Sequence, residues 1–291
     1  MSTEKQNRKE KKIPSVMPKA PTPTALVFRR FELEFSNRIA SIDIAEKWDN
    51  VGFLVESPRA SSLSELRIMT CIDLTGDVVT EAMKKQCNLI LAYHPVLFRA
   101  THSLSMANHA SILRCVDSGI SVFSPHTALD NTSDGMNDFL CDMFRTSESK
   151  RSEIRLDVAS GAQVGRLSIL AEPLSLHGVI NILKSKLGVD SIRYACASHE
   201  SIESVKISSI GVCVGSGSSV LMNAPADLYL TGEMTHHDIL ACVAVGKSVI
   251  LLDHSSSERP FLPELAKRLR EFEDVSEVFV SESDREPIRV A

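Results

Sequence analysis

The chain has 291 residues, of which 43% are hydrophobic and 24% are charged, an ordinary balance for a globular protein of one large or two small domains. Its net charge of −5 does not favour binding to nucleic acid or to an acidic membrane. The charge is uneven: residues 1–30 carry eight basic and two acidic side chains, so the remainder is near −11 and we expect no direct nucleic-acid binding.

The N-terminal segment 1–26 is polar, basic and rich in proline. Such a segment cannot bury enough apolar surface to offset its chain entropy, and we expect a disordered tail. A targeting peptide and a basic arm for nucleic acid are the functional alternatives. Glu4, Glu10 and the prolines are atypical of a mitochondrial presequence, and the composition favours a solvated tail.

From Val27 to residue 150, short apolar runs alternate with helical patterns, beginning with Phe31, Phe35 and Ile39 at helical spacing. The expected elements are a helix around 31–39, a turn and strand over 48–55, a strand over 67–72, a helix over 78–83, a strand ending at His94, a helix over 112–116, a strand ending near Pro125 and a helix over 136–144.

Residues 146–155 are polar and charged and indicate a boundary, after which the same rhythm returns. The expected elements are a strand over 167–170, a helix over 176–187, strands over 205–214 and 228–230, a helix over 239–245, a strand over 249–252, a helix over 262–272 and a strand over 278–280. This alternation indicates an α/β fold with a largely parallel sheet. We therefore expect a first α/β lobe over 27–150 and a second over 151–291.

The seven cysteines are scattered singly and form no CxxC pair, so neither a disulfide framework nor a thiolate zinc site is expected. A reducing compartment follows, which makes the cytoplasm the expected location and the nucleus or the mitochondrion the alternatives. No apolar run approaches the length that spans a bilayer, and we expect no membrane association.

Four apolar runs each end within a few residues of histidine or carboxylate side chains. The runs 89–93, 120–123, 228–230 and 249–252 are followed, respectively, by His94, by His126 and Asp130, by Glu233, and by His254 and Glu258. Ligands of α/β sheets gather beyond the carboxyl ends of the strands. The pattern therefore predicts one mouth lined with potential metal ligands.

Each of these residues also has a purely structural interpretation. Glu258 could complement the dipole of the helix that the serines before it begin, while His254 packs in the loop. Asp130 could form an Asx-turn, and His94 could be a hydrogen-bonded core residue. The metal-site interpretation is favoured because several donor-bearing strand ends occur together.

The segment after the third run differs, because a Thr-x-x-Asp capping pattern begins the next helix there. His236 and His237 are adjacent, and on a helix they point about 100° apart and do not easily chelate one ion. We assign them to the cavity walls, with Glu233 as a candidate proton-transfer group. The glycine-serine loop 215–219 lacks the spacing of a phosphate-binding or dinucleotide loop, which favours a tight turn over an anion-binding nest.

Several ordered motifs cover the chain from about Phe31 to Ile288. They are Trp48-Asp49-Asn50-Val51-Gly52, Tyr93-His94-Pro95, the Ser-Pro-His-Thr-Ala-Leu-Asp run at 124–130, Gly215-Ser216-Gly217, the run Leu-Thr-Gly-Glu-Met-Thr-His-His-Asp at 230–238, and His-Ser-Ser-Ser-Glu-Arg at 254–259. Together they resemble the Nif-three-like family (NGG-one-interacting factor three-like proteins), also labelled homologues of a type-two GTP cyclohydrolase.

The resemblance implies layered sheets covered by helices, in two related α/β lobes around a metal-binding cleft, and a toroidal homohexamer. It also implies two divalent ions, with the family's ligands carried over to His94, Asp130, His254 and Glu258, and with Glu258 bridging both ions. The chain departs from the family where Tyr93 replaces a histidine of the His-His-Pro motif found in many members. The ion held by His94, Asp130 and Glu258 keeps its ligands, whereas the second loses one and should bind weakly. The chain also lacks the middle domain of longer members.

Two functions follow from these residues and the resemblance. The first is a metal-dependent hydrolase or cyclohydrolase acting on a nucleotide-like substrate, in which His126 or Glu233 moves protons. The metal is one tight divalent ion, with a second weak one, and Zn, Fe, Mn and Mg all remain open. The second function is a non-catalytic interaction protein that contacts transcriptional co-regulators, as the family name implies.

Overall fold

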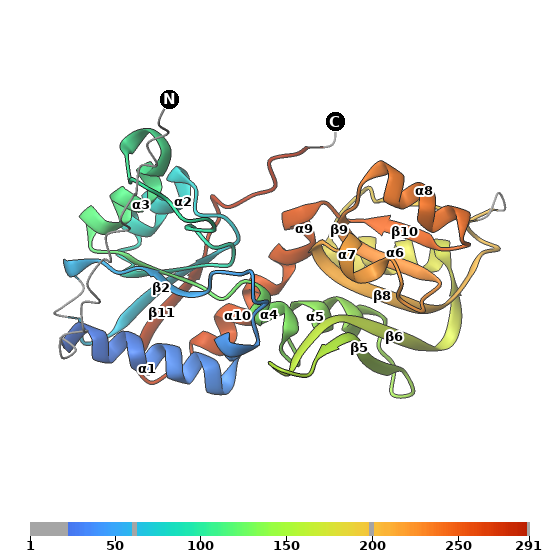
Figure 1. Cartoon of the computed structure of the whole chain (residues 1–291), viewed down its shortest axis with the longest axis horizontal. Coiled ribbons are helices and arrows are strands. Elements are labelled where there is room, and N and C mark those ends of the chain that lie inside the picture. The colour runs from blue at the N-terminus through green and yellow to red at the C-terminus, as the bar shows by residue number, and fades with distance from the viewer. Residues whose placement is uncertain (1–22, 60–62, 198–200, 290–291) are drawn as a thin grey trace, which may run out of the picture.

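Two β-sheets organise the chain, and each lies at the centre of one lobe (Figure 1). The computed structural model describes residues 23–59, 63–197 and 201–289. Most of the predicted tail, residues 1–22, lies outside these ranges, whereas its last residues already belong to the first helix. The α/β class expected from the sequence is confirmed.

The first sheet has five strands in the order β1-β4-β3-β2-β11. Their bounds are β1 (Gly52–Val55), β2 (Leu66–Cys71), β3 (Leu89–Ala92), β4 (Ser121–Ser124) and β11 (Val275–Val280). The pairs β4-β3, β3-β2 and β2-β11 are parallel, and β1 is an antiparallel edge strand. Because β2, β3 and β4 run in the same direction, the segments that follow them emerge at one edge of the sheet.

Helices cover both faces of the first sheet, which explains its nearly continuous apolar strands. Along β3, Leu89 and Leu91 face one core, while Ile90 and Ala92 face the other. Helices α2 and α3 pack on the second of these faces, and α1 and α10 belong to the first core. Their bounds are α1 (Pro23–Arg38), α2 (Gly76–Lys84), α3 (Met106–Ser118) and α10 (Leu262–Leu269).

The second sheet has six strands in the order β5-β6-β8-β9-β10-β7. Their bounds are β5 (Lys150–Asp157), β6 (Ala162–Ser175), β7 (Arg193–Ala195), β8 (Lys206–Ser216), β9 (Leu228–Glu233) and β10 (Ser248–Leu251). Strands β8, β9 and β10 are parallel, but the other pairs are antiparallel, so this sheet is mixed rather than largely parallel. The polar stretch predicted as a boundary is mostly β5, an edge strand whose side chains are largely exposed.

The remaining helices lie around the second sheet and between the lobes. They are α4 (Thr127–Asn131), α5 (Met136–Cys141), α6 (Leu176–Leu187), α7 (Ser218–Leu221), α8 (His236–Ala244) and α9 (His254–Glu258), with short 3-10 turns η1 (Ile42–Ile44), η3 (Asp142–Phe144) and η4 (Arg259–Phe261). Helix α6 packs in the core shared with the first lobe, whereas α7 and α8 cover the outer face of the second sheet. Within the described ranges, no helix has the length and apolarity needed to cross a bilayer.

The C-terminal end of the chain departs from the predicted division into 27–150 and 151–291. Strand β11 pairs in parallel with β2, with Val278 opposite Ile68, so the last strand returns to the first lobe. Without β11, the buried strand β2 would be an edge strand with unpaired backbone groups. One hydrophobic core contains both Phe31 of the first lobe and Ile207 of the second, and the two lobes are therefore packed together.

Candidate functional site

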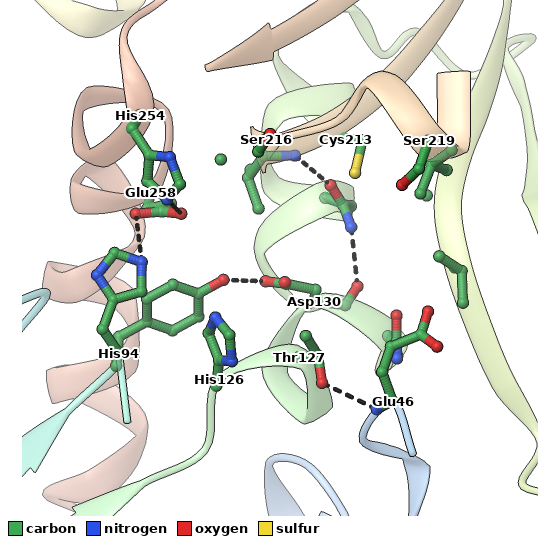
Figure 2. Close-up of a pocket in the computed structure, with 18 of the residues that line it drawn as sticks. Glu46, His94, His126, Thr127, Asp130, Cys213, Ser216, Ser219, His254 and Glu258 are labelled. Carbon is green, nitrogen blue, oxygen red and sulfur yellow. Dashed lines mark hydrogen bonds and ion pairs between the residues drawn. The ribbon is translucent and has the colours of Figure 1, made fainter. Parts of the chain in front are cut away.

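A cavity of about 650 Å³ lies where segments from both sheets meet. Its walls include the residues that follow β3 and β4 of the first lobe, and the start of α9 after β10 of the second. Five of the six predicted site residues line it, namely His94, His126, Asp130, His254 and Glu258. Figure 2 shows His94 and His254 on either side of the Glu258 carboxylate, with His126 and Asp130 farther along the cavity.

The donor atoms of His94, His254 and Glu258 all lie within 4.8 Å of one another. The two lobes supply different ligands, because His94 follows β3 whereas His254 and Glu258 begin and end α9. The spacing of four residues puts His254 and Glu258 on the same face of that helix. In the part of the chain that the structure describes, this is the group of three such side chains that is close enough to hold one ion.

The contacts of Glu258 fit a bound cation better than they fit hydrogen bonds. Its side chain is 2% exposed, with Oε1 3.4 Å from His254 Nε2 and Oε2 3.5 Å from His94 Nε2. Both distances exceed an ordinary N–H···O bond, whereas donors around one tetrahedral ion lie about 3.3 Å apart. Oε2 also accepts no hydrogen bond from the described residues. A buried carboxylate without full hydrogen bonding is costly, and a cation would stabilise it.

The other ring nitrogens of the two histidines are held by carboxylates. His94 Nδ1 is 2.9 Å from Asp73 Oδ1, and His254 Nδ1 is 2.9 Å from Glu233 Oε1. This is the arrangement found around metal-binding histidines, in which a second carboxylate fixes the ring and leaves Nε2 to face the ion. Glu233 therefore lies where it can orient His254.

The charge balance around His94 favours a positive charge at this point. Burial lowers the pKa of its imidazole, but the hydrogen bond with Asp73 and the contact with Glu258 have a larger, opposite effect. The net result is a pKa raised to about 10. The same interaction outweighs the effect of burial on Asp73 and lowers the pKa of that carboxyl. The carboxylates of Asp73 and Glu258 therefore both favour positive charge at His94.

Gly215, near the end of β8, leaves room for the two ligands on α9. Its φ of +62° lies in the left-handed region, and a Cβ there would be 2.6 Å from Glu258 Oε1 and 3.2 Å from His254 Nε2. Both the backbone conformation and the space therefore require glycine. The tight turn predicted for residues 215–219 is wrong, because β8 continues to Ser216 and α7 begins at Ser218, which leaves only Gly217 between them.

His126 is held in place by Asp49, a residue of the first motif. Its Nδ1 is 2.7 Å from Asp49 Oδ1, and the Asp49 carboxylate also accepts hydrogen bonds from the Thr127 amide and hydroxyl. Burial raises the pKa of Asp49, but these hydrogen bonds outweigh it and lower the pKa overall. His126 has a φ of +35°, a strained conformation for a residue with a side chain. The arrangement aims an oriented imidazole into the cavity.

Asp130 lies in the cavity but is paired with Tyr93. The Tyr93 hydroxyl donates a hydrogen bond of 2.7 Å to Asp130 Oδ1, and Tyr93 is 1% exposed. Burial raises the pKa of Asp130 to about 7 and raises that of Tyr93 well above its usual range. The donor atoms thus divide differently from the ligand set that the resemblance implies, because His94 groups with His254 and Glu258 rather than with Asp130.

The residues around the cavity differ in part from those predicted from the sequence. His236 and His237 are exposed on α8 and do not line the cavity, so their assignment to its walls is wrong. Their side chains pair with each other instead, with ring centroids 5.5 Å apart. Asp73 and Asp49 were missed as partners of histidines. The signal for Asp73 was available, because it too follows the carboxyl end of a buried strand.

A family model described as Duf34/NIF3 (NGG1p interacting factor 3) matches residues 30–287. The chain is 34% identical over 262 residues to NGG1-interacting factor 3 of Saccharomyces cerevisiae, covering 84% of this chain and 91% of the relative. It is 36% identical over 250 residues to NIF3-like protein 1 of Drosophila melanogaster, covering 84% and 82% of the two chains. Among solved structures, a Bacillus cereus protein related to NIF3 has a TM-score of 0.74 at 15% identity, covering 94% of this chain and 100% of that one.

Proposed function

The chain belongs to the Duf34/NIF3 family, and we propose that it is a divalent-metal-binding protein of hydrolase-like architecture, with one ion held by His94, His254 and Glu258. The observation that carries this proposal is the Glu258 carboxylate, which is buried between two imidazole nitrogens at 3.4 and 3.5 Å. Asp73 and Glu233 orient the two rings from behind. Nitrogen and carboxylate donors of this kind suit Zn, Fe or Mn better than Mg, which prefers oxygen ligands.

A hydrolytic reaction is the chemistry that this cavity supports best. A bound divalent ion lowers the pKa of a water molecule and polarises an oxygen of the substrate. His126 is the residue that would move the proton, because Asp49 holds one of its ring nitrogens and leaves the other for the cavity. Glu233 is a weaker candidate for the same role, since it contacts His254.

A nucleotide-like substrate is supported by aromatic side chains at the cavity. Trp48 and Phe98 are 59% and 47% exposed, and both line it. Trp48 lies with its ring centroid 6.0 Å from those of Phe98 and His126. An exposed aromatic face of this kind is a surface on which a planar base stacks, an interaction worth about 1–3 kcal/mol per base.

Metal analysis of the purified full-length chain tests the binding proposal. After dialysis against metal-free buffer, the parent should retain close to one divalent ion per chain, and His94→Ala should retain far less. His236→Ala is the matched control, since that histidine is exposed outside the cavity. A parent chain without a stoichiometric ion, or equal loss in the two variants, would overturn the proposal.

Activity is tested by screening the metal-loaded chain against nucleotide and phosphoester libraries. Trp48→Ala should lower kcat/KM for substrates that carry a base and leave simple phosphoesters unaffected. Loss of activity in His126→Ala with metal content preserved would assign the proton-moving role to His126. Activity that is independent of both substitutions would contradict this account of the cavity.

A second candidate function is that of an interaction protein. The observation behind it is the name of the yeast relative, which is called NGG1-interacting factor 3. On this hypothesis the chain contacts transcriptional co-regulators and has no need of a stoichiometric ion, so the metal analysis separates the two functions.

Self-association into a homohexamer remains a prediction of the family resemblance, and light scattering of the full chain tests it.

A further inference from the structure

The segment that follows β11 crosses from the first lobe toward the second, and in Figure 1 it is the dark red stretch before the C-terminus. We call residues 281–286 the C-terminal brace. The brace begins on α2, where the Glu81 carboxylate accepts hydrogen bonds from the Ser281 hydroxyl at 2.6 Å and from the amides of Glu282 and Ser283 at 3.1 and 3.0 Å. Its start is thus fixed to the first lobe.

The centre of the brace is Asp284, which is 5% exposed. Its carboxylate accepts hydrogen bonds from the amides of Ile72 at 2.7 Å and Asp73 at 3.4 Å, and it forms an ion pair with Arg259. Asp73 is the residue that orients His94, and Arg259 directly follows Glu258. One buried carboxylate therefore joins the segment behind one proposed ligand to the segment behind another.

The end of the brace contacts the helix that carries the other two proposed ligands. Glu286 accepts a hydrogen bond from the Ser255 hydroxyl at 2.7 Å, and the Ser256 hydroxyl lies at 3.4 Å. Arg259 Nη2 also donates to Ser255 Oγ at 2.8 Å. Ser255 and Ser256 lie inside α9, between His254 and Glu258.

We propose that Asp284 is a positioning residue, which sets the distance between the metal ligands of the two lobes by tying the loop after β2 to α9. This inference rests on the proposed metal site, although Asp284 itself contacts none of the three ligands in it. His94 comes from one sheet and the other ligands from another, so their separation depends on how the lobes are held at this point. Partners behind the ligands commonly change metal affinity about 10–100-fold when substituted.

The test is Asp284→Asn in the full-length chain, titrated with Co²⁺ against a competing chelator. Asparagine keeps the shape and one acceptor oxygen but lacks the charge that holds Arg259. We expect Co²⁺ affinity to fall about 10–100-fold and the visible spectrum of the bound Co²⁺ to change. Asp227→Asn is the matched control, because Asp227 also accepts two backbone amides, those of Ser208 at 2.8 Å and Ser209 at 3.0 Å, just before β9 and away from the cavity.

The control should lower the melting temperature of the metal-free chain without changing Co²⁺ affinity or spectrum. Equal affinity and an unchanged spectrum in Asp284→Asn would overturn the inference, as would an equal loss of affinity in Asp227→Asn. If Asp284→Asn fails to fold, Glu286→Gln replaces it, and several-fold weaker binding is expected while an unchanged affinity refutes the role of the brace. A parent chain that binds no Co²⁺ overturns the proposed metal site itself, whereas a parent that binds while both brace variants match it overturns only this inference.

Discussion

Gly215→Ala separates the geometry of the proposed metal site from the general stability of the fold. The added methyl group would lie 2.6 Å from Glu258 Oε1, and the carboxylate would have to withdraw by about 0.8 Å to reach an ordinary contact of 3.4 Å. His254 would be crowded as well, with Nε2 at 3.2 Å. Two of the three proposed ligands would therefore move away from their shared centre.

Backbone strain contributes separately, because Gly215 has a φ of +62°. An alanine in the left-handed region costs roughly 1–2 kcal/mol. Gly188→Ala carries the same strain without the crowding, since its φ is +68° and no atom lies within 4 Å of the added Cβ. Gly188→Ala should lose roughly 1–2 kcal/mol of unfolding free energy. Gly215→Ala should lose at least as much, because the crowding adds to the strain, and it alone should lose metal affinity, by about 10–100-fold.

The assay is urea unfolding of the metal-free chains together with competitive metal titration of the same samples. Stability alone would fall in the control, whereas both quantities would fall in Gly215→Ala. If Gly215→Ala binds metal as tightly as Gly188→Ala, then Glu258 and His254 are not ligands in the arrangement described above.

Three further outcomes test the same cavity. Glu258→Gln should remove bound metal more completely than His254→Ala, because Glu258 lies between the two imidazoles, and equal metal content in Glu258→Gln and the parent would end this idea. The parent should carry closer to one tight ion than two. Tyr93→His should add the second ion, because it supplies an imidazole and frees the Asp130 carboxylate from its hydrogen bond with the Tyr93 hydroxyl. Two equally tight ions in the parent would show that another residue replaces the missing ligand. Burial raises the pKa of Asp130 to about 7, so the metal-free fold loses stability as pH rises from about 4 through 7, because the unfolded chain gives up this proton first. Asp130→Asn should therefore raise the melting temperature at pH 8 but not at pH 4. An equal effect at the two pH values would refute the shift in pKa.

Local patterns were enough to locate most of the candidate site. Continuous apolar runs predicted the strands that correspond to β3, β4, β9 and β10. The structure confirms their positions to within a few residues. Each histidine follows the carboxyl end of a buried strand, where site residues gather. However, β3 and β10 belong to different sheets, so His94 and His254, which are 160 positions apart in the sequence, meet because the two lobes pack together. The same pattern included Asp130 and Glu258, to which the motif resemblance then assigned metal-ligand roles, and all four residues line one cavity.

The sequence alone thus determined the class of the fold, because buried strands and amphipathic helices have recognisable patterns of apolar residues. It also determined which side chains follow each strand. Tertiary structure decided which partner each side chain takes. The return of β11 to β2, the pairing of Asp130 with Tyr93 and the contact of Asp284 with Arg259 join segments that are distant along the chain. Such long-range pairings form because strand edges and charged groups that become buried when the lobes pack need hydrogen-bond or ionic partners. No local sequence pattern indicates which partner each of them takes.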